Sequence, residues 1–235
     1  MKITRKILLA LLMFATISCS GSQKRFEFPR EAFVQLKKTV TIKRCKSGKP
    51  FDCLRTTNGI SGSGSIVKVT KVGSYVLTAE HVCQSATLKK FTKGKKVEGQ
   101  DFFAIDLDGK EYNLKVIGVN IRADLCLVFA QGLISHPAIP ISPTPPKPGR
   151  TFYNLAAPQG VFNIDLLPLF AGYFAGTDGE NDIYCIPAAK GSSGSPVLNE
   201  RGEIVGVITR TFHNFNNMSL SPSYNFLSAF LSNYL

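Results

Sequence analysis

Residues 191–197 read GSSGSPV, and this glycine- and serine-rich stretch decides the fold. Gly191 and Gly194 permit a sharp bend of the backbone, and an apolar β-type segment follows directly after it. The bend presents three serines, at positions 192, 193 and 195, as candidate nucleophiles. Taken alone, such a stretch is usually an ordinary loop, so its meaning depends on the rest of the chain.

Two earlier segments supply the partners that a catalytic serine needs. Residues 75–83 (YVLTAEHVC) form an apolar strand that ends at His81, and residues 122–128 (RADLCLV) place Asp124 at the start of another. A serine hydroxyl is a weak nucleophile, so a base must remove its proton during attack. Histidine suits this role because its pKa lies near ~6.5, and a carboxylate can orient the imidazole. Each segment alone has a structural explanation, but together and in this order they predict a catalytic triad.

The three segments resemble the TAAHC, DLAL and GNSGGP segments of the trypsin-like (chymotrypsin-fold) serine peptidases. Residues 191–207 (GSSGSPVLNERGEIVGV) are most similar to the bacterial glutamyl-endopeptidase and HtrA-like branches. Residues 149–160 (GRTFYNLAAPQG) resemble the strand and turn that open the second barrel there, and the resemblance spans residues 60–235.

The resemblance implies a role for each residue. Alignment on GNSGGP makes Ser193 the nucleophile rather than Ser192 or Ser195, with His81 as general base and then acid, and Asp124 as its orienter. The backbone N–H groups of Gly191 and Ser193 would form an oxyanion hole. The other common serine pattern, G-x-S-x-G, fails because Ser195 occupies its last place and because the histidine precedes the serine.

The body of the chain predicts an all-β fold. Short runs rich in Val, Ile, Phe and Tyr alternate with turn residues, which is typical of a barrel or sandwich. Residues 136–150 carry six prolines and cannot form a helix or an interior strand. We therefore expect two antiparallel β-barrels of chymotrypsin type, at residues 21–135 and 151–235, joined by this linker. The second unit ends in a helix docked on it, with Ser221 as cap and Pro222 at the first helical position.

The residues expected to bind substrate argue against a trypsin-type preference for Lys or Arg. Pro187 stands where trypsin-like enzymes that select Lys or Arg carry an acid, and Ile208 stands where glutamyl endopeptidases carry a histidine. Pro187, Ala188 and Ile208 therefore favour a small to medium apolar side chain before the scissile bond. Lys190 at the pocket rim would instead favour an acid. Substrate is expected to pair by β-addition along the strand that continues through Thr209 and Arg210.

The N-terminus predicts export. Residues 1–20 combine a basic start, an apolar run too short to span a membrane and small residues, as in a signal peptide. Cys19 stands where a bacterial lipoprotein carries its lipid, although Thr16 replaces the usual leucine. Ordinary cleavage nearby is the alternative to lipidation and membrane anchoring. We expect a periplasmic, cell-surface or secreted protein.

The cysteines fit this compartment. Besides Cys19, five remain, so at least one thiol is unpaired. Cys45 and Cys53 flank a turn and are the preferred disulfide pair; the connectivity of the others stays open. Without CxxC or clustered His and Cys, a zinc site is not expected, nor is another metal or a cofactor.

The chain carries a net charge of +12, which first suggests nucleic acid as partner. The leader contributes three of these charges, and export argues against nucleic acid. The dense basic loop Lys89–Lys96 could contact an anionic surface, although most such runs are simply solvated.

Three functions remain. The favoured one is an exported serine endopeptidase that acts on polypeptides through an acyl-enzyme. The others are an inactive peptidase-fold binding protein and a cationic envelope or adhesion module.

Overall fold

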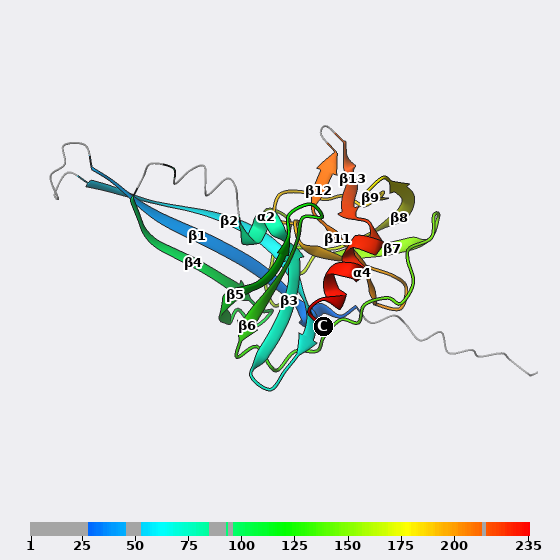
Figure 1. Ribbon diagram of the computed structural model, residues 1–235, viewed down its shortest axis with the longest axis horizontal. Helices are drawn as coiled ribbons and strands as arrows, with labels where there is room; N and C mark the ends of the chain where they lie inside the picture. Colours follow the sequence, from blue (N-terminus) through cyan, green and yellow to red (C-terminus); the bar gives the residue numbers. More distant parts are fainter. Residues whose placement is uncertain (1–27, 46–52, 85–92, 94–95, 213–214) are drawn as a thin grey trace, which may run out of the picture.

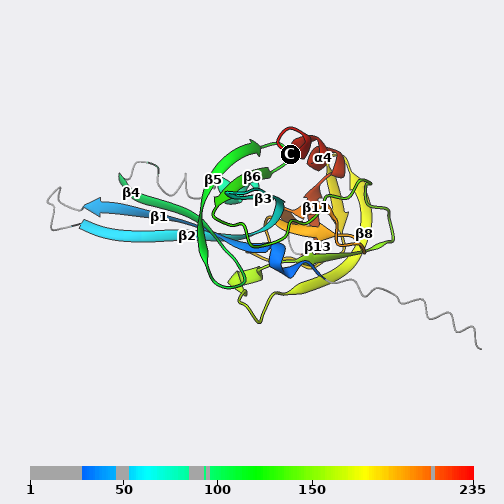
Figure 2. The same ribbon diagram turned by 90° about the horizontal axis from the view of Figure 1, so that it is seen from below.

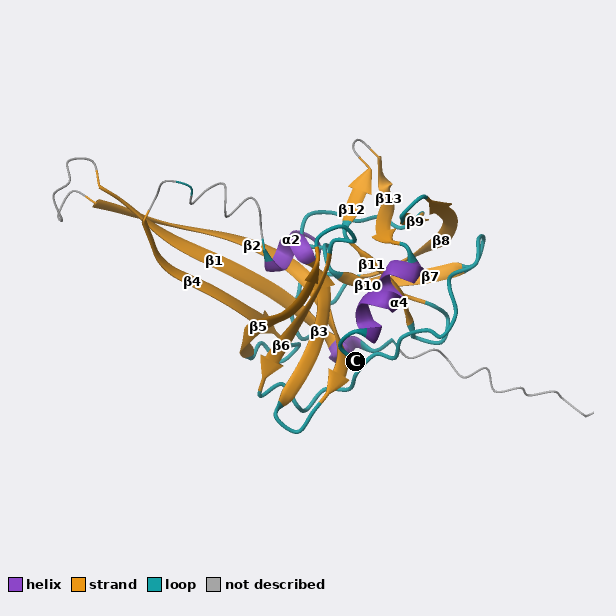
Figure 3. Cartoon of the chain, viewed as in Figure 1, coloured by secondary structure: helices purple, strands orange, loops and turns teal. Residues whose placement is uncertain are grey.

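The computed structural model describes residues 28–45, 53–84, 93, 96–212 and 215–235. Thirteen strands and very little helix make up this part of the chain (Figure 1, Figure 3). The strands form one closed barrel followed by one curled sheet, so the predicted all-β, chymotrypsin-type architecture is confirmed.

The closed barrel contains six antiparallel strands in the order β1-β2-β3-β6-β5-β4. In chain order they are β1 (Phe33–Cys45), β2 (Cys53–Val69), β3 (Gly73–Ala79), β4 (Lys96–Ile105), β5 (Glu111–Asn120) and β6 (Leu125–Gln131). β3 and β6 consist mostly of apolar residues and are almost fully buried.

Three of these strands extend well beyond the barrel as a long arm (Figure 1, Figure 2). We define the arm as residues 39–45 of β1, 53–61 of β2 and 96–101 of β4, with β1 in the centre. A disulfide joins Cys45 to Cys53 at its tip, as the sequence predicted. At its base, the buried Lys38 donates a hydrogen bond to the carbonyl of Cys83, which lies just after His81.

The second sheet has seven strands in the order β11-β10-β7-β8-β9-β13-β12. They are β7 (Thr151–Leu155), β8 (Leu169–Asp178), β9 (Asn181–Tyr184), β10 (Ser195–Leu198), β11 (Ile204–Ile208), β12 (Arg210–Phe212) and β13 (Phe215–Pro222). The two end strands, β11 and β12, are separated only by Thr209. Because the Thr209 N–H donates to the carbonyl of Leu220 on β13 at 2.9 Å, the sheet curls back on itself.

The linker fastens the two sheets together. The Ile139 N–H donates to the carbonyl of Ile66 in the barrel at 2.8 Å, and Ile141 forms a bridge to Ile204 of the second sheet. His136 is buried and bonds to Asp106 at 3.2 Å. The prolines therefore mark a segment that is fixed by tertiary contacts.

The C-terminal helix α4 (Tyr224–Ser232) differs from the prediction at its start. Pro222 is the last residue of β13, so neither it nor Ser221 begins the helix. The first turn is instead capped from a distance, because the carboxylate of Asp182 accepts from the Tyr224 N–H at 2.9 Å. Burial raises the pKa of Asp182, against the hydrogen bonds from Thr177 and Tyr224.

The same helix contacts both sheets and not the second one alone. Its buried face, Leu227, Phe230 and Leu231, belongs to the core that also contains barrel residues. Tyr234, just beyond the helix, lies so close to Gly118 of β5 that a Cβ there would collide with its ring. The helix thereby stabilises the contact between the two units.

Parts of the sequence prediction fall outside the described residues. These are the leader with Cys19 and most of the basic loop Lys89–Lys96. Among the described residues, no helix has the length and apolar character needed to cross a bilayer.

Candidate active site

His81 lies in α2 (Glu80–Cys83), a single helical turn directly after β3. Asp124 precedes β6 and adopts a left-handed backbone conformation with φ of 52°. Because β3 and β6 are neighbouring antiparallel strands with Ala79 opposite Leu125, the two side chains emerge at the same end of the barrel. Barrel topology thus joins two residues that are 43 positions apart.

The Asp124 carboxylate holds His81 by two kinds of hydrogen bond. It accepts from the His81 backbone N–H at 3.0 Å, and its oxygens lie 2.9 and 3.0 Å from Nδ1 of the ring. With Nδ1–H directed to the carboxylate, Nε2 remains available to accept a proton. The His81 side chain is 42% exposed and that of Asp124 only 19%, so the ring faces solvent while its orienting group is sheltered.

A second disulfide reinforces this pair. It joins Cys83 to Cys126, and each of these residues lies two positions after a proposed catalytic residue, His81 or Asp124. The sequence left this connectivity open. The bond fixes the helical turn of the histidine to the strand of the aspartate, while Cys185 is an exposed free thiol.

The serine-rich bend lies between β9 and β10, and its two glycines are required by geometry. Gly191 and Gly194 have φ values of 96° and 89°, which L-residues with a side chain rarely adopt. A Cβ at Gly194 would lie 2.1 Å from both the Ser63 carbonyl oxygen and the Thr78 hydroxyl. The bend is therefore pressed directly against the barrel.

Backbone hydrogen bonds place Ser193 between the two sheets. Its carbonyl accepts from the Ser63 N–H of β2 at 2.8 Å, and the next N–H, of Gly194, donates to the carbonyl of Ile208 at 2.7 Å. A Cβ at Gly62 would touch both the Ser193 carbonyl and Val82, so the bend lies beside the turn that carries His81. Within the described part of the chain, no hydrogen bond joins the Ser193 hydroxyl to His81; such bonds are often long before substrate binds.

The amides of the bend are arranged to receive an anion. Among the described residues, neither the Gly191 N–H nor the Ser193 N–H donates to any acceptor. The Lys190 carbonyl accepts from the Gln159 N–H at 2.6 Å, and the Gly191 carbonyl accepts from the Ser63 hydroxyl at 2.7 Å. Since a trans peptide directs its carbonyl and its N–H oppositely, fixing the Lys190 carbonyl fixes the direction of the Gly191 N–H.

Ser63 and Gln159 were not identified from the sequence. Ser63 is fully buried, and its hydroxyl also accepts from the Ala157 N–H at 3.1 Å, so it links β2, the bend and the segment that follows β7. Gln159 is held at φ of 54°. The residues around Ser63 and Gln159 in the sequence do not indicate a functional role. Each of the two acts by bonding to the bend, which is distant in the sequence.

The residues predicted to bind substrate divide by exposure. Ala188 and Ile208 are buried and belong to one core cluster of the second sheet. Thr209 is also buried, and its hydroxyl lacks a hydrogen-bond partner in the structure. Lys190 and Arg210 are exposed, with Arg210 bonded to the Asn181 side chain at 2.6 Å, and Pro187 is half-buried.

One group of potential metal ligands lies elsewhere. Ligand atoms of Asp106, Asp108 and His136 lie within 4.8 Å of one another. The Asp106 carboxylate already accepts from the Lys110 N–H, the Tyr112 hydroxyl and His136, at 2.9, 2.8 and 3.2 Å. Burial alone would raise the pKa of Asp106, but these hydrogen bonds outweigh it and lower the pKa. We assign the group a structural role, in which it fastens the linker to the barrel.

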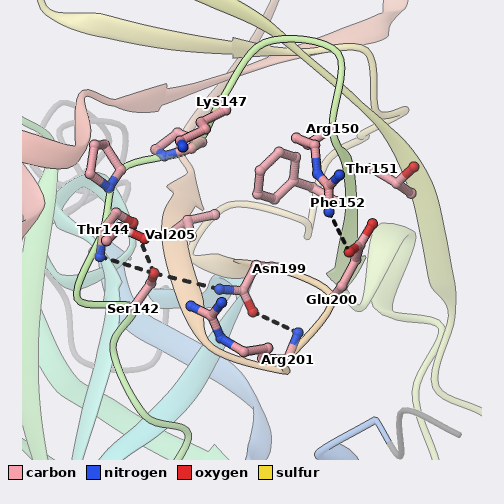
Figure 4. Close-up of a pocket in the computed structure, with 12 residues that line it drawn as sticks. Ser142, Thr144, Lys147, Arg150, Thr151, Phe152, Asn199, Glu200, Arg201 and Val205 are labelled. Carbon is pink, nitrogen blue, oxygen red and sulfur yellow. Dashed lines mark hydrogen bonds and ion pairs between the residues drawn. The ribbon is translucent and has the colours of Figure 1, made fainter. Parts of the chain in front are cut away.

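A surface cavity of about 340 Å³ lies between the linker and the β10–β11 turn (Figure 4). Its cations are largely neutralised, since Arg150 pairs with Glu200 at 2.8 Å and Arg201 with Glu203 at 2.7 Å. It contains none of the residues of the candidate active site.

The family of the chain follows from comparison with known proteins. Residues 62–207 match the family of trypsin-like peptidase domains, and the chain belongs to that family. None of the curated proteins matches the sequence. The fold is similar to that of the serine endoprotease from Yersinia pestis, with a TM-score of 0.61 and 18% identity over 87% of this chain and 63% of that one. At this identity the likeness concerns the fold alone, and the chain spans less than two thirds of that enzyme. By family the chain therefore carries a trypsin-like peptidase domain, and its fold is of the chymotrypsin type.

Proposed function

We propose that this chain is an exported serine endopeptidase that hydrolyses peptide bonds through an acyl-enzyme, with Ser193, His81 and Asp124 as its triad. The observation that carries the proposal is the paired geometry around Ser193. A histidine oriented by a carboxylate at 2.9 Å lies on the barrel side, and two amides without acceptors lie in the bend itself.

The reaction uses these groups in order. The Ser193 hydroxyl attacks the substrate carbonyl carbon while Nε2 of His81 takes its proton, and the carbonyl oxygen becomes an oxyanion. The N–H groups of Gly191 and Ser193 bind this oxyanion, a contribution of roughly 3–4 kcal/mol per donor in comparable enzymes. His81 then gives the proton to the leaving amine. A water molecule, deprotonated by His81, releases the acyl group and restores Ser193.

Covalent labelling tests the activity. A fluorophosphonate probe is expected to label the purified protein in wild type and to fail in Ser193→Ala and His81→Ala. Ser195→Ala is the matched control, because this serine lies two residues away, is buried and bonds to Asn154. Folded wild type that takes no label contradicts the proposal and favours an inactive peptidase-fold binding protein.

A small to medium apolar side chain before the scissile bond remains the proposed preference. The buried, apolar Ala188 and Ile208 support it, and Lys190 at an exposed position keeps an acidic preference open. A peptide-library profile distinguishes these, and a profile dominated by Lys or Arg would contradict both.

The proposal places the protein outside the cytoplasm, with Cys19 as the site of a lipid anchor. This rests on residues 1–20 of the sequence. Palmitate labelling that is lost in Cys19→Ala supports the anchor, and labelling that persists in the variant contradicts it. Salt-sensitive binding to anionic vesicles without fluorophosphonate labelling would instead favour the cationic envelope module.

A further inference from the structure

The strand β2 has a long unpaired edge next to the candidate active site. β1 pairs with β2 along its whole arm region, from Cys45 opposite Cys53 to Phe33 opposite Ser65. On the other side, β3 pairs with β2 only from Ser65 onward. Within the described residues, no strand therefore covers the outer edge of residues 54–61 (Figure 1, Figure 2).

The direction of the backbone groups along this edge follows from two hydrogen bonds. The Ser63 N–H donates to the Ser193 carbonyl, and the Ser63 carbonyl accepts from the Thr78 hydroxyl, so Ser63 faces away from β1. In an antiparallel pair, alternate residues face the partner strand and the others face away. Ser61, Gly59, Thr57 and Arg55 hence direct their N–H and carbonyl groups outward as well.

This edge is continuous with the catalytic bend. Ser193 is bonded to β2 on one side and, through the Gly194 N–H, to Ile208 on the other. β12, which begins two residues after Ile208, is the end strand of its sheet, and no other described strand pairs with its second edge. An extended chain that passes over Ser193 from the β12 edge must therefore continue toward the outer edge of β2.

The surface along the edge suits a peptide backbone. Residues 54–57 and 59 of β2 are exposed, and the side chains there are mainly threonine or absent, as at Gly59. Arg55 lies across the sheet in an ion pair with Glu98 at 2.7 Å. An open edge of this length is a template for pairing with another chain, and proteins usually block such edges.

We propose that the outer edge of β2 from Ser61 to Arg55 binds the part of a polypeptide substrate that follows the scissile bond, as an added β-strand. The inference rests on the proposed function and deepens it, since it names extended polypeptide with a long downstream segment as the substrate class. At ~3.3 Å per residue, the six steps from Ser61 to Arg55 span about 20 Å along β2. Short peptides should therefore be poorer substrates than long, unfolded ones.

The test is a series of fluorescent peptides with one acyl-side sequence and two, four, six or eight residues after the scissile bond. In wild type, kcat/KM is expected to rise by about tenfold across the series, which corresponds to about 1.4 kcal/mol. In Thr57→Pro, which removes one outward N–H, the rise should be largely lost. Proline is tolerated at the free side of an edge strand, and Thr57→Ala controls for the hydrogen bond between the Thr57 and Thr41 hydroxyls.

Gln100→Pro is the matched control on the opposite edge of the arm. Thr39 pairs with Gly59 and with Asp101. Because Gly59 faces away from β1, the backbone groups of Thr39 face β4 and bond to Asp101, which leaves Gln100 facing outward. This variant should keep the full length dependence. Equal loss in both proline variants would overturn the proposal.

Further measurements keep the two proposals separate. If wild type cleaves every peptide at the same rate, the proposal that the edge of β2 binds substrate is overturned, while the proposed peptidase activity stands. If wild type cleaves none of the peptides, the proposed peptidase activity is refuted. Anisotropy titrations of Ser193→Ala then still test peptide binding at the edge of β2, through the dependence of Kd on peptide length. If Thr57→Pro does not fold, N-methylation of alternate downstream peptide amides in wild type must reduce kcat/KM in a two-residue period. A wild-type dimer that Thr57→Pro dissociates, without length dependence, would assign the edge to a second copy and overturn the proposal.

Discussion

The Ser63→Ala variant probes how the catalytic bend is held. The Ser63 hydroxyl donates to the Gly191 carbonyl at 2.7 Å and accepts from the Ala157 N–H at 3.1 Å. Ser63, Gly191 and Ala157 are all buried, so water cannot replace the lost partner easily. Each buried polar group left unsatisfied costs about 1–3 kcal/mol. Two such groups are left, so we expect the free energy of unfolding to fall by about 2–6 kcal/mol.

Activity should fall in the same variant because the Gly191 carbonyl loses its anchor. The N–H of the same residue, Gly191, is one of the two proposed oxyanion donors, and its position depends on how firmly Gly191 is held from both sides; loss of one donor costs about 10²–10³ in kcat. Since the Gln159–Lys190 bond still constrains that N–H, a smaller reduction of roughly 10–100-fold is expected. Urea unfolding followed by circular dichroism, which suits a chain without tryptophan, and hydrolysis of a short fluorogenic substrate measure the two effects.

Ser65→Ala provides the matched control. Ser65 is also fully buried, lies two residues further along β2, and its hydroxyl has no hydrogen-bond partner in the structure. Its removal should leave both stability and activity nearly unchanged. If the two variants behave alike, the bridging role of Ser63 is refuted.

Three further variants test the site and its supports. Asp124→Asn should keep the fold, because asparagine tolerates its φ of 52°, and should lower kcat about 10⁴-fold because the wrong His81 tautomer is favoured; a steady-state assay that finds normal kcat contradicts this. Replacing both Cys83 and Cys126 by alanine should lower the free energy of unfolding by roughly 2–4 kcal/mol, and an unchanged urea midpoint would exclude that contribution. The pKa of Asp106 is lowered in the folded state, so its ionised carboxylate stabilises the fold above the unfolded-state pKa of about 3.9. This stabilisation is lost as the pH falls through the lower folded-state pKa. Between neutral pH and pH 3, Asp106→Asn should therefore lose less stability than wild type in thermal unfolding.

The strands that the sequence located are those with apolar, β-branched runs. The strand segments predicted within residues 75–83 and 122–128 correspond to β3 and β6, because both faces of these strands are buried and most of their residues are apolar. β1 and the distal half of β2 were missed. In β1, polar residues such as lysine and threonine separate the apolar ones, and the distal half of β2 is mainly polar. Both segments become strands through pairing with one another, and β1 also pairs with β4.

The helix start shows the same limit. Ser221 and Pro222 have the composition of a helix cap, but their pairing with Asp182 and Asn181 of β9 keeps them in β13. The helix begins at Tyr224, where Asp182 supplies the acceptor from 42 residues away. A cross-strand pairing, which the local sequence does not reveal, overrides the local cap motif.

The sequence by itself determined the all-β class, the family and the three residues proposed for catalysis. Short motifs suffice for this, because a tight glycine bend or a histidine at a strand end depends on adjacent residues. Only the tertiary structure decided what holds these residues in position and what lies beside them: the Cys83–Cys126 bond, the Ser63 bridge and the open edge of β2. Each of these depends on segments far apart in the chain, and their contact is set by strand order and register, which no local pattern of side chains specifies.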